Sequence, residues 1–232
     1  MVQTKMKTIL LSCCISFIAL SLVSCGSNRQ ASRNEPYLYL EMNVKPLEVA
    51  RTSFTKQEMS SIKAITEKRI EYLGVSSKTV TIKGQALVVE MYEYTDIEEA
   101  KKVLGKPGKF TFTDDQGNIV LTGEHMKKVT YSKRKIDAIG YELPVIELEF
   151  DKEGTKILAA STEKNLGKMM NINLDGETLM SPVVHDTIKN GKVILSLDSS
   201  TAESLKIVQQ ITALLKGGTI PAKIIITTAE IR

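Results

Sequence analysis

Two histidines stand beside carboxylates and are the first residues to test for acid–base chemistry. His125 follows Glu124, and His185 precedes Asp186. A histidine that faces a carboxylate can pass a proton to a reacting group. Adjacent residues on a strand point to opposite faces, so neither pair is expected to form a catalytic dyad. We interpret both histidines as turn or strand-end residues, and we expect no enzymatic activity.

Metal and phosphate chemistry are equally poorly supported. Asp114, Asp115 and Asn118 surround Gly117 and offer oxygen atoms of the kind that calcium binds, but their spacing does not match an EF-hand loop. A simple turn is the favoured interpretation. The two histidines are far apart and no thiol is available to join them, which argues against a transition-metal site. No Gly-rich phosphate loop is present. The sequence therefore predicts no catalytic residue, cofactor or metal.

Cys25 is the residue for which the sequence predicts a specific modification, because it ends a segment with the features of an export signal. Lys5 and Lys7 give a basic start, and the stretch from Ile9 to Val23 is mostly apolar and uncharged. A membrane-spanning helix needs roughly 20 apolar residues, and this stretch is shorter. We therefore predict a signal peptide over residues 1–24; an uncleaved anchor or an ordinary signal peptide are the alternatives.

The end of this segment, Leu22-Val-Ser-Cys25 followed by Gly26, resembles the lipobox of bacterial lipoproteins. The resemblance implies that the Cys25 thiol receives a diacylglyceryl group and that this residue becomes the new N-terminus. The protein would be attached to a membrane through lipid in the cell envelope, facing the extracytoplasmic side, either the periplasm or the cell surface. Stable attachment generally takes more than one acyl chain. Because Cys13 and Cys14 lie in the signal, the mature chain can form no internal disulfide.

Charge and composition limit the classes of partner that this protein is expected to bind. The 31 basic and 27 acidic residues leave a formal net charge of +4, which is not the strong basic field of a nucleic-acid binder. We expect no nucleic-acid partner. The polar stretch from Gly26 to Pro36 is typical of a flexible tether, which we assign to residues 25–36.

The first half of the mature chain predicts the order strand, helix, strand, strand, helix, strand. Thr55 with Glu58 and Thr95 with Glu98 have the spacing of capping boxes that open the two helices. Gly74 stands where a left-handed residue ends the first helix. The predicted strands are 37–44, 79–83, 86–92 and 109–113. This is the order of the ferredoxin-like split βαβ unit, with two helices on one face of an antiparallel sheet.

The second half predicts further strands and two more helices. Asp175-Gly176 suits a type I′ turn between residues 168–174 and 178–184, and Asn190-Gly191 repeats the device between 185–189 and 192–197. Ser200 with Glu203 has the spacing of another capping box. Other predicted elements are a strand over 144–150, a helix over 151–165, a helix ending at Gly217-Gly218 and a strand over 220–231.

Several segments together resemble the large first periplasmic domain of SecD, a membrane subunit that with SecF assists the general protein-export machinery. Ile65–Val75 is similar to a helix-to-turn segment at the start of that domain, and Thr95–Gly105 followed by 109–112 is similar to the next. The remaining similar segments are Leu121–Met126, Gly167–Gly176, Ser181–Val184, Ile188–Gly191 and Ala202–Ala222. They occur in the family's order and cover nearly the whole mature chain.

The resemblance implies an α+β architecture in which a ferredoxin-like base carries an inserted head subdomain. Residues 37–113, completed by 219–232, would form the base, and residues 114–218 would form the head. The sequence departs from SecD in three respects. The Pro-Gly turn after the third base strand is replaced by Glu90–Tyr94. The Asp-Leu-x-Gly-Gly motif expected near the first strand is replaced by Tyr37–Met42. SecD also has membrane helices whose ionisable residues couple to protons, and we expect this chain to lack such coupling of its own.

Two surface features are open to more than one interpretation. Lys127, Lys128, Lys133, Arg134 and Lys135 form a basic cluster around Tyr131. We expect a solvated hairpin or loop there; contact with anionic phospholipid headgroups or an acidic partner is the functional alternative. Met169, Met170 and Met180 flank the Asp175-Gly176 turn. Methionine adapts to irregular apolar partners, so these residues could bind unfolded segments, although core packing is the favoured explanation.

The sequence favours a non-enzymatic envelope lipoprotein that binds polypeptide as an accessory in protein export or envelope assembly. The Sec translocon is one possible partner, and strand-edge or groove capture is an ordinary way to hold a polypeptide. The alternative is a structural module that docks onto another envelope protein complex. The third class, a hydrolase, has no recognisable nucleophile and base.

Overall fold

The computed structural model describes residues 35–135, 142–196 and 201–232. All of them belong to one compact unit, Ala31–Arg232. The predicted signal peptide 1–24, the lipid-accepting Cys25 and most of the tether 25–36 lie outside the described residues. No helix in the described ranges is long and apolar enough to cross a membrane.

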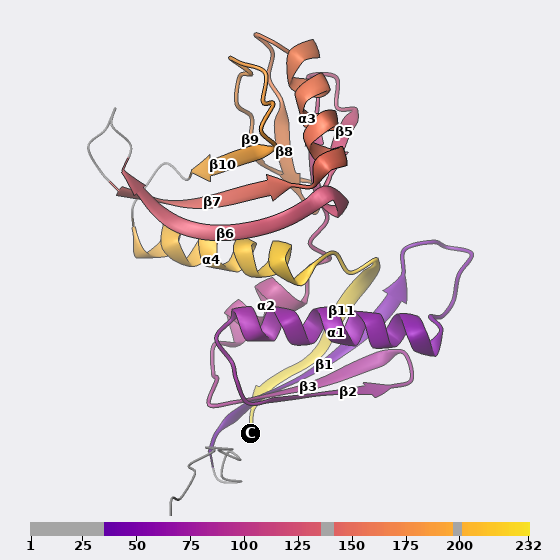
Figure 1. Ribbon diagram of the computed structural model, residues 1–232. Coiled ribbons are helices and arrows are strands. Elements are labelled where there is room, and N and C mark those ends of the chain that lie inside the picture. Colours follow the sequence, from indigo (N-terminus) through magenta and orange to yellow (C-terminus); the bar gives the residue numbers. More distant parts are fainter. Residues whose placement is uncertain (1–34, 136–141, 197–200) are drawn as a thin grey trace, which may run out of the picture. The chain divides into compact units, whose positions relative to one another are not determined.

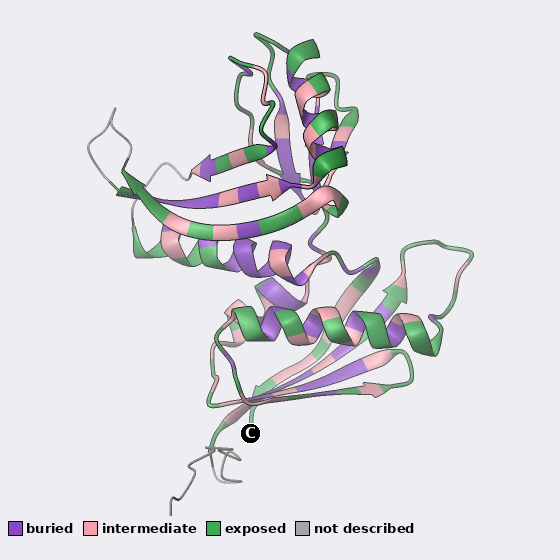
Figure 2. Cartoon of the chain, in the orientation of Figure 1, coloured by how far each residue is buried: buried purple, intermediate pink, exposed green. Residues whose placement is uncertain are grey.

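A four-stranded antiparallel sheet has the order β11-β1-β3-β2 (Figure 1). Its elements are β1 (Tyr37–Pro46), β2 (Lys78–Lys83), β3 (Ala86–Tyr92) and β11 (Ala222–Ile231), with helices α1 (Lys56–Tyr72) and α2 (Ile97–Leu104) over one face. Every second residue of β1 from Leu38 to Val44 is buried against these helices, as the two-residue period of a strand requires. This is the ferredoxin-like arrangement, and Figure 2 shows its buried layer between sheet and helices.

The fourth strand of this sheet is not the one predicted from the local sequence. Residues 109–113 were expected to complete it, but β4 (Phe110–Thr113) pairs with β5 (Ile119–Thr122) and β8 (Asn171–Leu174) in another sheet. The place beside β1 is taken by β11, which lies within the segment 219–232 that the SecD resemblance assigned to the base. The alternating pattern of a strand indicates which of its side chains are buried, but it does not identify the neighbouring strand.

The strands from β4 to β10 form two further sheets. One has the order β5-β4-β8-β9, where β9 is Glu177–Met180, and the other has the order β10-β7-β6. The strands of the second are β6 (Met126–Lys135), β7 (Glu142–Phe150) and β10 (Lys192–Ser196), and the short helix η1 (Gly123–His125) precedes β6. Helix α3 (Lys152–Lys164) contacts β5 and β7.

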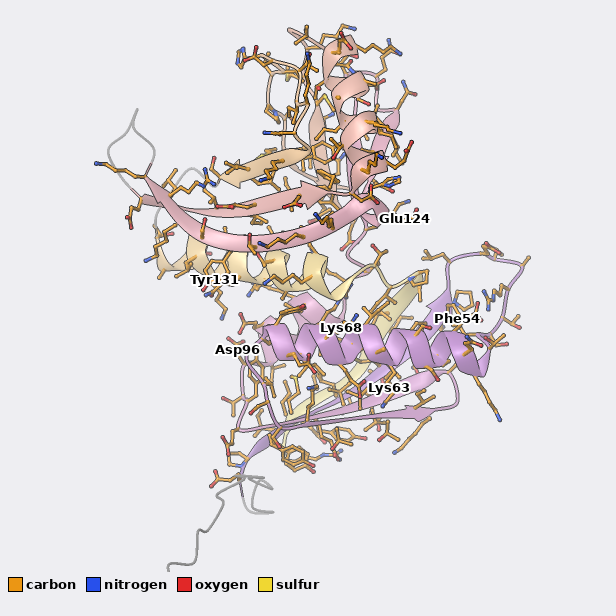
Figure 3. All side chains as sticks on the ribbon, viewed as in Figure 1. Phe54, Lys63, Lys68, Asp96, Glu124 and Tyr131 are labelled. Carbon is orange, nitrogen blue, oxygen red and sulfur yellow. The ribbon has the colours of Figure 1, made fainter. Side chains whose placement is uncertain are left out.

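Helix α4 (Ala202–Gly217) joins the two halves of this unit, because it contacts α1 and α2 on one side and β6 and β7 on the other. Polar contacts reinforce both sides. Lys206 donates to Asp96 at the start of α2 with 2.6 Å between Nζ and Oδ2, and Gln209 reaches the Tyr131 hydroxyl on β6 at 3.5 Å. Figure 3 labels Asp96 and Tyr131 on these two neighbours of α4. Nine residues of α4 are buried, which is consistent with a helix packed on both faces.

The two predicted glycine turns have different outcomes. Asp175 and Gly176 have φ values of 54° and 86° and connect β8 to β9, which confirms a turn with two left-handed residues. The second prediction was wrong, since residues 185–189 form no strand. Instead the Gly191 carbonyl accepts the Phe150 N–H at 2.9 Å, and the chain continues into β10 beside β7.

Three capping boxes were predicted and one is confirmed. At α1 the Thr55 hydroxyl accepts the Glu58 N–H, and the Glu58 carboxylate accepts the Thr55 N–H. The other two were placed one residue too early. Asp96 caps α2 through the Glu99 N–H, and Thr201 caps α4 through the Ser204 N–H. In each case the adjacent residue also has a capping oxygen, so the sequence pattern fits either register.

Candidate functional site

An apolar groove of about 490 Å³ opens between β8, β9 and β10. The helix α3, the strand β4 and the segment 181–188 complete its walls. Its lining is mostly apolar and includes Phe112, Leu158, Met170, Ile172, Met180 and Ile188. Two lining residues on the rim, Val183 and Ile194, leave 42% and 47% of their surface exposed. The groove therefore presents apolar side chains both inside and at its mouth.

The β8–β9 hairpin and α3 hold the walls of the groove in place. At the hairpin tip the Asp175 N–H donates to the Lys109 carbonyl at 2.8 Å, and the Lys109 N–H donates to Asp175 Oδ1 at 2.7 Å. On the opposite side the Thr162 hydroxyl accepts the Ile188 N–H at 3.0 Å and donates to the Leu158 carbonyl. These hydrogen bonds tie the hairpin tip to the residue before β4, and they tie Ile188 to the side chain of Thr162 on α3, so two walls of the groove are held in place.

The methionines divide between the core and the groove. Met170 is buried, Met180 is partly buried, and both line the groove. Met169 is 55% exposed and pairs with Val183 through an isolated bridge beside the rim. Core packing, the favoured interpretation, holds for Met170. Met169 and Met180 provide the flexible apolar surface that the alternative interpretation required.

Few charges line the groove. Asp186 and Lys192 are its carboxylate and ammonium groups, and His185 stands beside Asp186. None of these three side chains has an ion-pair partner within 4.0 Å among the residues that the structure describes. An otherwise apolar groove with one exposed charge of each sign suits a ligand that is apolar in its middle and carries opposite charges at its ends.

Comparison with protein families shows which group contains this chain. The model of the SecDF P1 head subdomain matches residues 98–222, and the model of the N-terminal part of the P1 domain of protein translocase subunit SecDF matches residues 59–117. The chain belongs to the SecDF P1 family. The groove lies entirely within the residues that match the P1 head.

Relatives support the same assignment. Protein translocase subunit SecD of Acidaminococcus fermentans is 34% identical over 163 residues, which cover 69% of this chain and 36% of the relative. SecD of Dictyoglomus turgidum is 30% identical over 161 residues, covering 69% of this chain and 38% of the relative. The chain thus spans well under half of the length of these relatives.

Two solved SecDF structures have the same fold. SecDF in its super-membrane-facing form aligns with a TM-score of 0.69 at 20% identity, covering 84% of this chain and 30% of that chain. A structure of SecDF, described as a membrane component that enhances protein export, aligns at 0.65 and 20% identity over 82% of this chain and 98% of that chain. The predicted SecD periplasmic family and the mixed α+β fold class are confirmed. The limits predicted for base and head remain a prediction.

The P1 fold does not bring either histidine into a pair with its predicted neighbour. His125 Nδ1 lies 3.4 Å from Asp151 Oδ2, and Glu124 points elsewhere at the surface (Figure 3). Asp151 is the N-cap of α3, and the Gly154 N–H that donates to it at 2.7 Å is the main reason why its pKa is lowered. His185 and Asp186 both line the groove in the head. His125 thus contacts the carboxylate that caps α3 and not that of Glu124.

The residues Asp114 to Asn118 form the simple turn favoured above. Asp114 Oδ1 accepts the N–H groups of Gln116 and Asn118 at 3.0 and 2.8 Å, so the carboxylate is engaged within the turn. Asp115 forms an ion pair with Lys168 instead. Within the described ranges, no group of three or more His, Cys, Asp or Glu side chains is arranged to hold a metal ion.

The predicted basic cluster lies on β6, which pairs antiparallel with the next strand β7, so of the expected hairpin or loop it is the hairpin that the structure shows. Lys127 forms an ion pair with Glu149 at 2.7 Å, and Arg134 forms one with Glu147 at 2.9 Å. The Lys127 contact is the main reason why the pKa of Glu149 is lowered. The pKa of Glu147 is also lowered, first by the hydrogen bond from the Ser132 hydroxyl and then by the one from Arg134. The cluster is thus partly neutralised, and lysine on an edge strand is a common protection against unwanted pairing.

Sequence reasoning missed Arg69, the largest fully buried side chain in the described residues. Its Nη1 donates to the carbonyls of Val103 at 3.1 Å and of Lys106, and its Nη2 donates to those of Pro107 and Gly218 at 2.6 and 2.7 Å. One side chain thus holds both connections between the base sheet and the head. Burial lowers its pKa to about 10. A signal was available, because Arg69 falls on the buried face of α1 with Met59, Ile62 and Thr66.

Proposed function

We propose that this protein binds unfolded polypeptide in the groove of its P1 head and does not catalyse a reaction. The carrying observation is the preformed apolar groove with exposed apolar residues on its rim, located in the head of a SecDF P1 fold. Binding sites are usually concave, mostly apolar and largely preformed, with a few polar groups that orient the ligand. A patch of adaptable methionine beside the groove allows segments of different sequence to pack there.

The cellular role follows from the family. The two relatives described above are protein translocase subunits, and one similar structure is of a component that enhances protein export. We propose that this chain is an envelope lipoprotein, anchored to the extracytoplasmic side of a membrane through lipid on Cys25, and that it assists protein export or envelope assembly. Its partners would be exported polypeptides and the Sec translocon.

Fluorescence anisotropy with the purified protein tests the binding site. A labelled, unfolded, signal-bearing polypeptide should bind, and Val183→Asp should raise its dissociation constant at least about tenfold, because it places a charge on the apolar rim. Ile119→Asp is the matched control, since Ile119 is 56% exposed on β5 of the head and does not line the groove. An unchanged anisotropy on adding the wild-type protein would refute polypeptide binding.

Crosslinking in cells tests the role. The lipid-anchored protein should capture translocon subunits or many unrelated exported chains. Capture of a single envelope complex in fixed stoichiometry would contradict the proposal and identify a docking module.

A further inference from the structure

The strand β10 forms one edge of its sheet and one wall of the groove in the head. Among the described strands only β7 pairs with it. An edge strand has a row of N–H and C=O groups that point away from the sheet and are open to another chain. Lys192, Ile194 and Ser196 of β10 line the groove.

The pairing register shows which main-chain groups of β10 face the groove. The Phe150 N–H donates to the Gly191 carbonyl at 2.9 Å, and these residues stand opposite each other one step before the Lys192–Glu149 pair. In an antiparallel ladder, bonded and non-bonded pairs alternate. Val193 and Leu195 therefore bond to β7. Lys192, Ile194 and Ser196 turn their main-chain groups away from β7, and all three line the groove. The Lys192 N–H already donates to Asn190 Oδ1 at 3.0 Å, so the open edge consists of the Lys192 carbonyl and the N–H and C=O groups of Ile194 and Ser196.

The charges of the groove favour a particular occupant. Its Asp186 carboxylate and Lys192 ammonium balance each other, and its remaining lining is mostly apolar. A segment that is uncharged in its middle and carries opposite charges at its ends complements this lining. An extended chain along β10 would also direct every second side chain toward the apolar wall that includes Met180 and Val183.

We propose that the groove takes polypeptide as an added strand on β10, bonded to the Lys192 carbonyl and to the outward N–H and C=O groups of Ile194 and Ser196. This inference rests on the proposed function and specifies its substrate class. The substrate is an extended, uncharged segment of about five residues with alternating apolar side chains. Recognition is mainly through the main chain, so it tolerates many sequences but requires free N–H groups at alternate positions.

Backbone methylation of the ligand tests this mode directly. The parent is a labelled peptide of about seven residues that alternates valine and threonine between a terminal lysine and a terminal glutamate. Two isomers carry N-methyl groups on the valines or on the threonines. Strand addition uses the N–H groups of one set only, so one isomer should lose at least about tenfold in affinity for the full-length protein, and the other should bind like the parent.

A proline on the protein gives the reciprocal test. Ile194→Pro removes one outward N–H and leaves the bonds to β7, so the fold should persist and the parent peptide should bind at least about tenfold more weakly. Lys133→Pro is the matched control. Lys133 lies on β6, the other edge strand of the same sheet, opposite Pro144 of β7. Circular dichroism of both variants checks the fold.

The outcomes separate the two proposals. If both methylated isomers and Ile194→Pro bind like their parents, the groove holds polypeptide without strand pairing, and this inference is overturned while the proposed function stands. If the parent peptide and the unfolded polypeptide both fail to bind the wild-type protein, both proposals fall.

Discussion

At the scale of single residues, Arg69 is the side chain whose replacement we expect to lower stability most. Burying a guanidinium is costly, and the lowered pKa of Arg69 reflects that cost. Its four carbonyl partners come from the last turn of α2, from the residues that follow α2, and from Gly218 after α4, where the chain enters and leaves the head. The cost is thus offset by hydrogen bonds that no other buried side chain in the described residues supplies to these carbonyls.

We expect Arg69→Met to lower the free energy of unfolding by at least about 3 kcal/mol, because four buried carbonyls lose their donor. Arg69→Lys should have an intermediate effect, since an ammonium keeps the charge but lacks the planar fork. Urea denaturation followed by circular dichroism measures both. Equal stability of Arg69→Met and the wild type would show that water replaces the guanidinium at this joint.

Residue identity also explains which parts of the site could be predicted. The methionines and His185-Asp186 were recognised from their types, and the structure places them at or beside one groove. The open edge of β10 was not predicted, because it depends on which strands pair with β7 and not on the residues of β10 itself. Arg69 was overlooked because arginine is rarely buried, although its spacing on α1 matched the buried face.

At the scale of secondary-structure elements, local patterns predicted most strands and helices but not their partners. The extent of α1, the hairpin of β2 with β3 and the turn of β8 with β9 follow from capping, glycine and alternation. The pairing of β4 with β8 joins segments that are far apart in the chain. Such pairings are set by tertiary packing, which a single sequence does not display.

The turn before β10 supports a prediction at this scale. Gly191 has φ of 65°, and a Cβ there would lie 2.1 Å from Thr155 Oγ1 on α3. Gly191→Ala should therefore cost more than the roughly 1 kcal/mol of a left-handed alanine, because α3 or β10 must also shift. Gly176→Ala is the matched control, since Gly176 has φ of 86° with no atom within 4 Å of the added Cβ.

Thermal unfolding should give a lower melting temperature for Gly191→Ala than for Gly176→Ala, and peptide affinity should fall only for Gly191→Ala because β10 forms the wall of the groove. Equal melting temperatures for the two variants would contradict the predicted clash.

At the scale of the whole molecule, the proposed attachment to a membrane depends on Cys25. We expect Cys25→Ser to abolish labelling by a fatty-acid analogue and to leave unprocessed precursor, because serine offers no thiol to the acyl donor. Labelling and the mass of the processed protein are the measurements. Cys13→Ser is the control within the predicted signal and should leave both unchanged. Persistent labelling of Cys25→Ser would disprove the predicted attachment site.

The pairing of β1 with β11 also sets an order for biosynthesis. These neighbours are separated by the whole head in the sequence, so a ribosome must finish the head before β11 exists. The entropy of closing a loop grows slowly with its length, by about 0.6 kcal/mol for each doubling, but an unfolded head would make this loop long and its closure slow. Folding of the head before β11 pairs with β1 shortens this loop, and until β11 is made the β1 edge of the base lacks its partner strand.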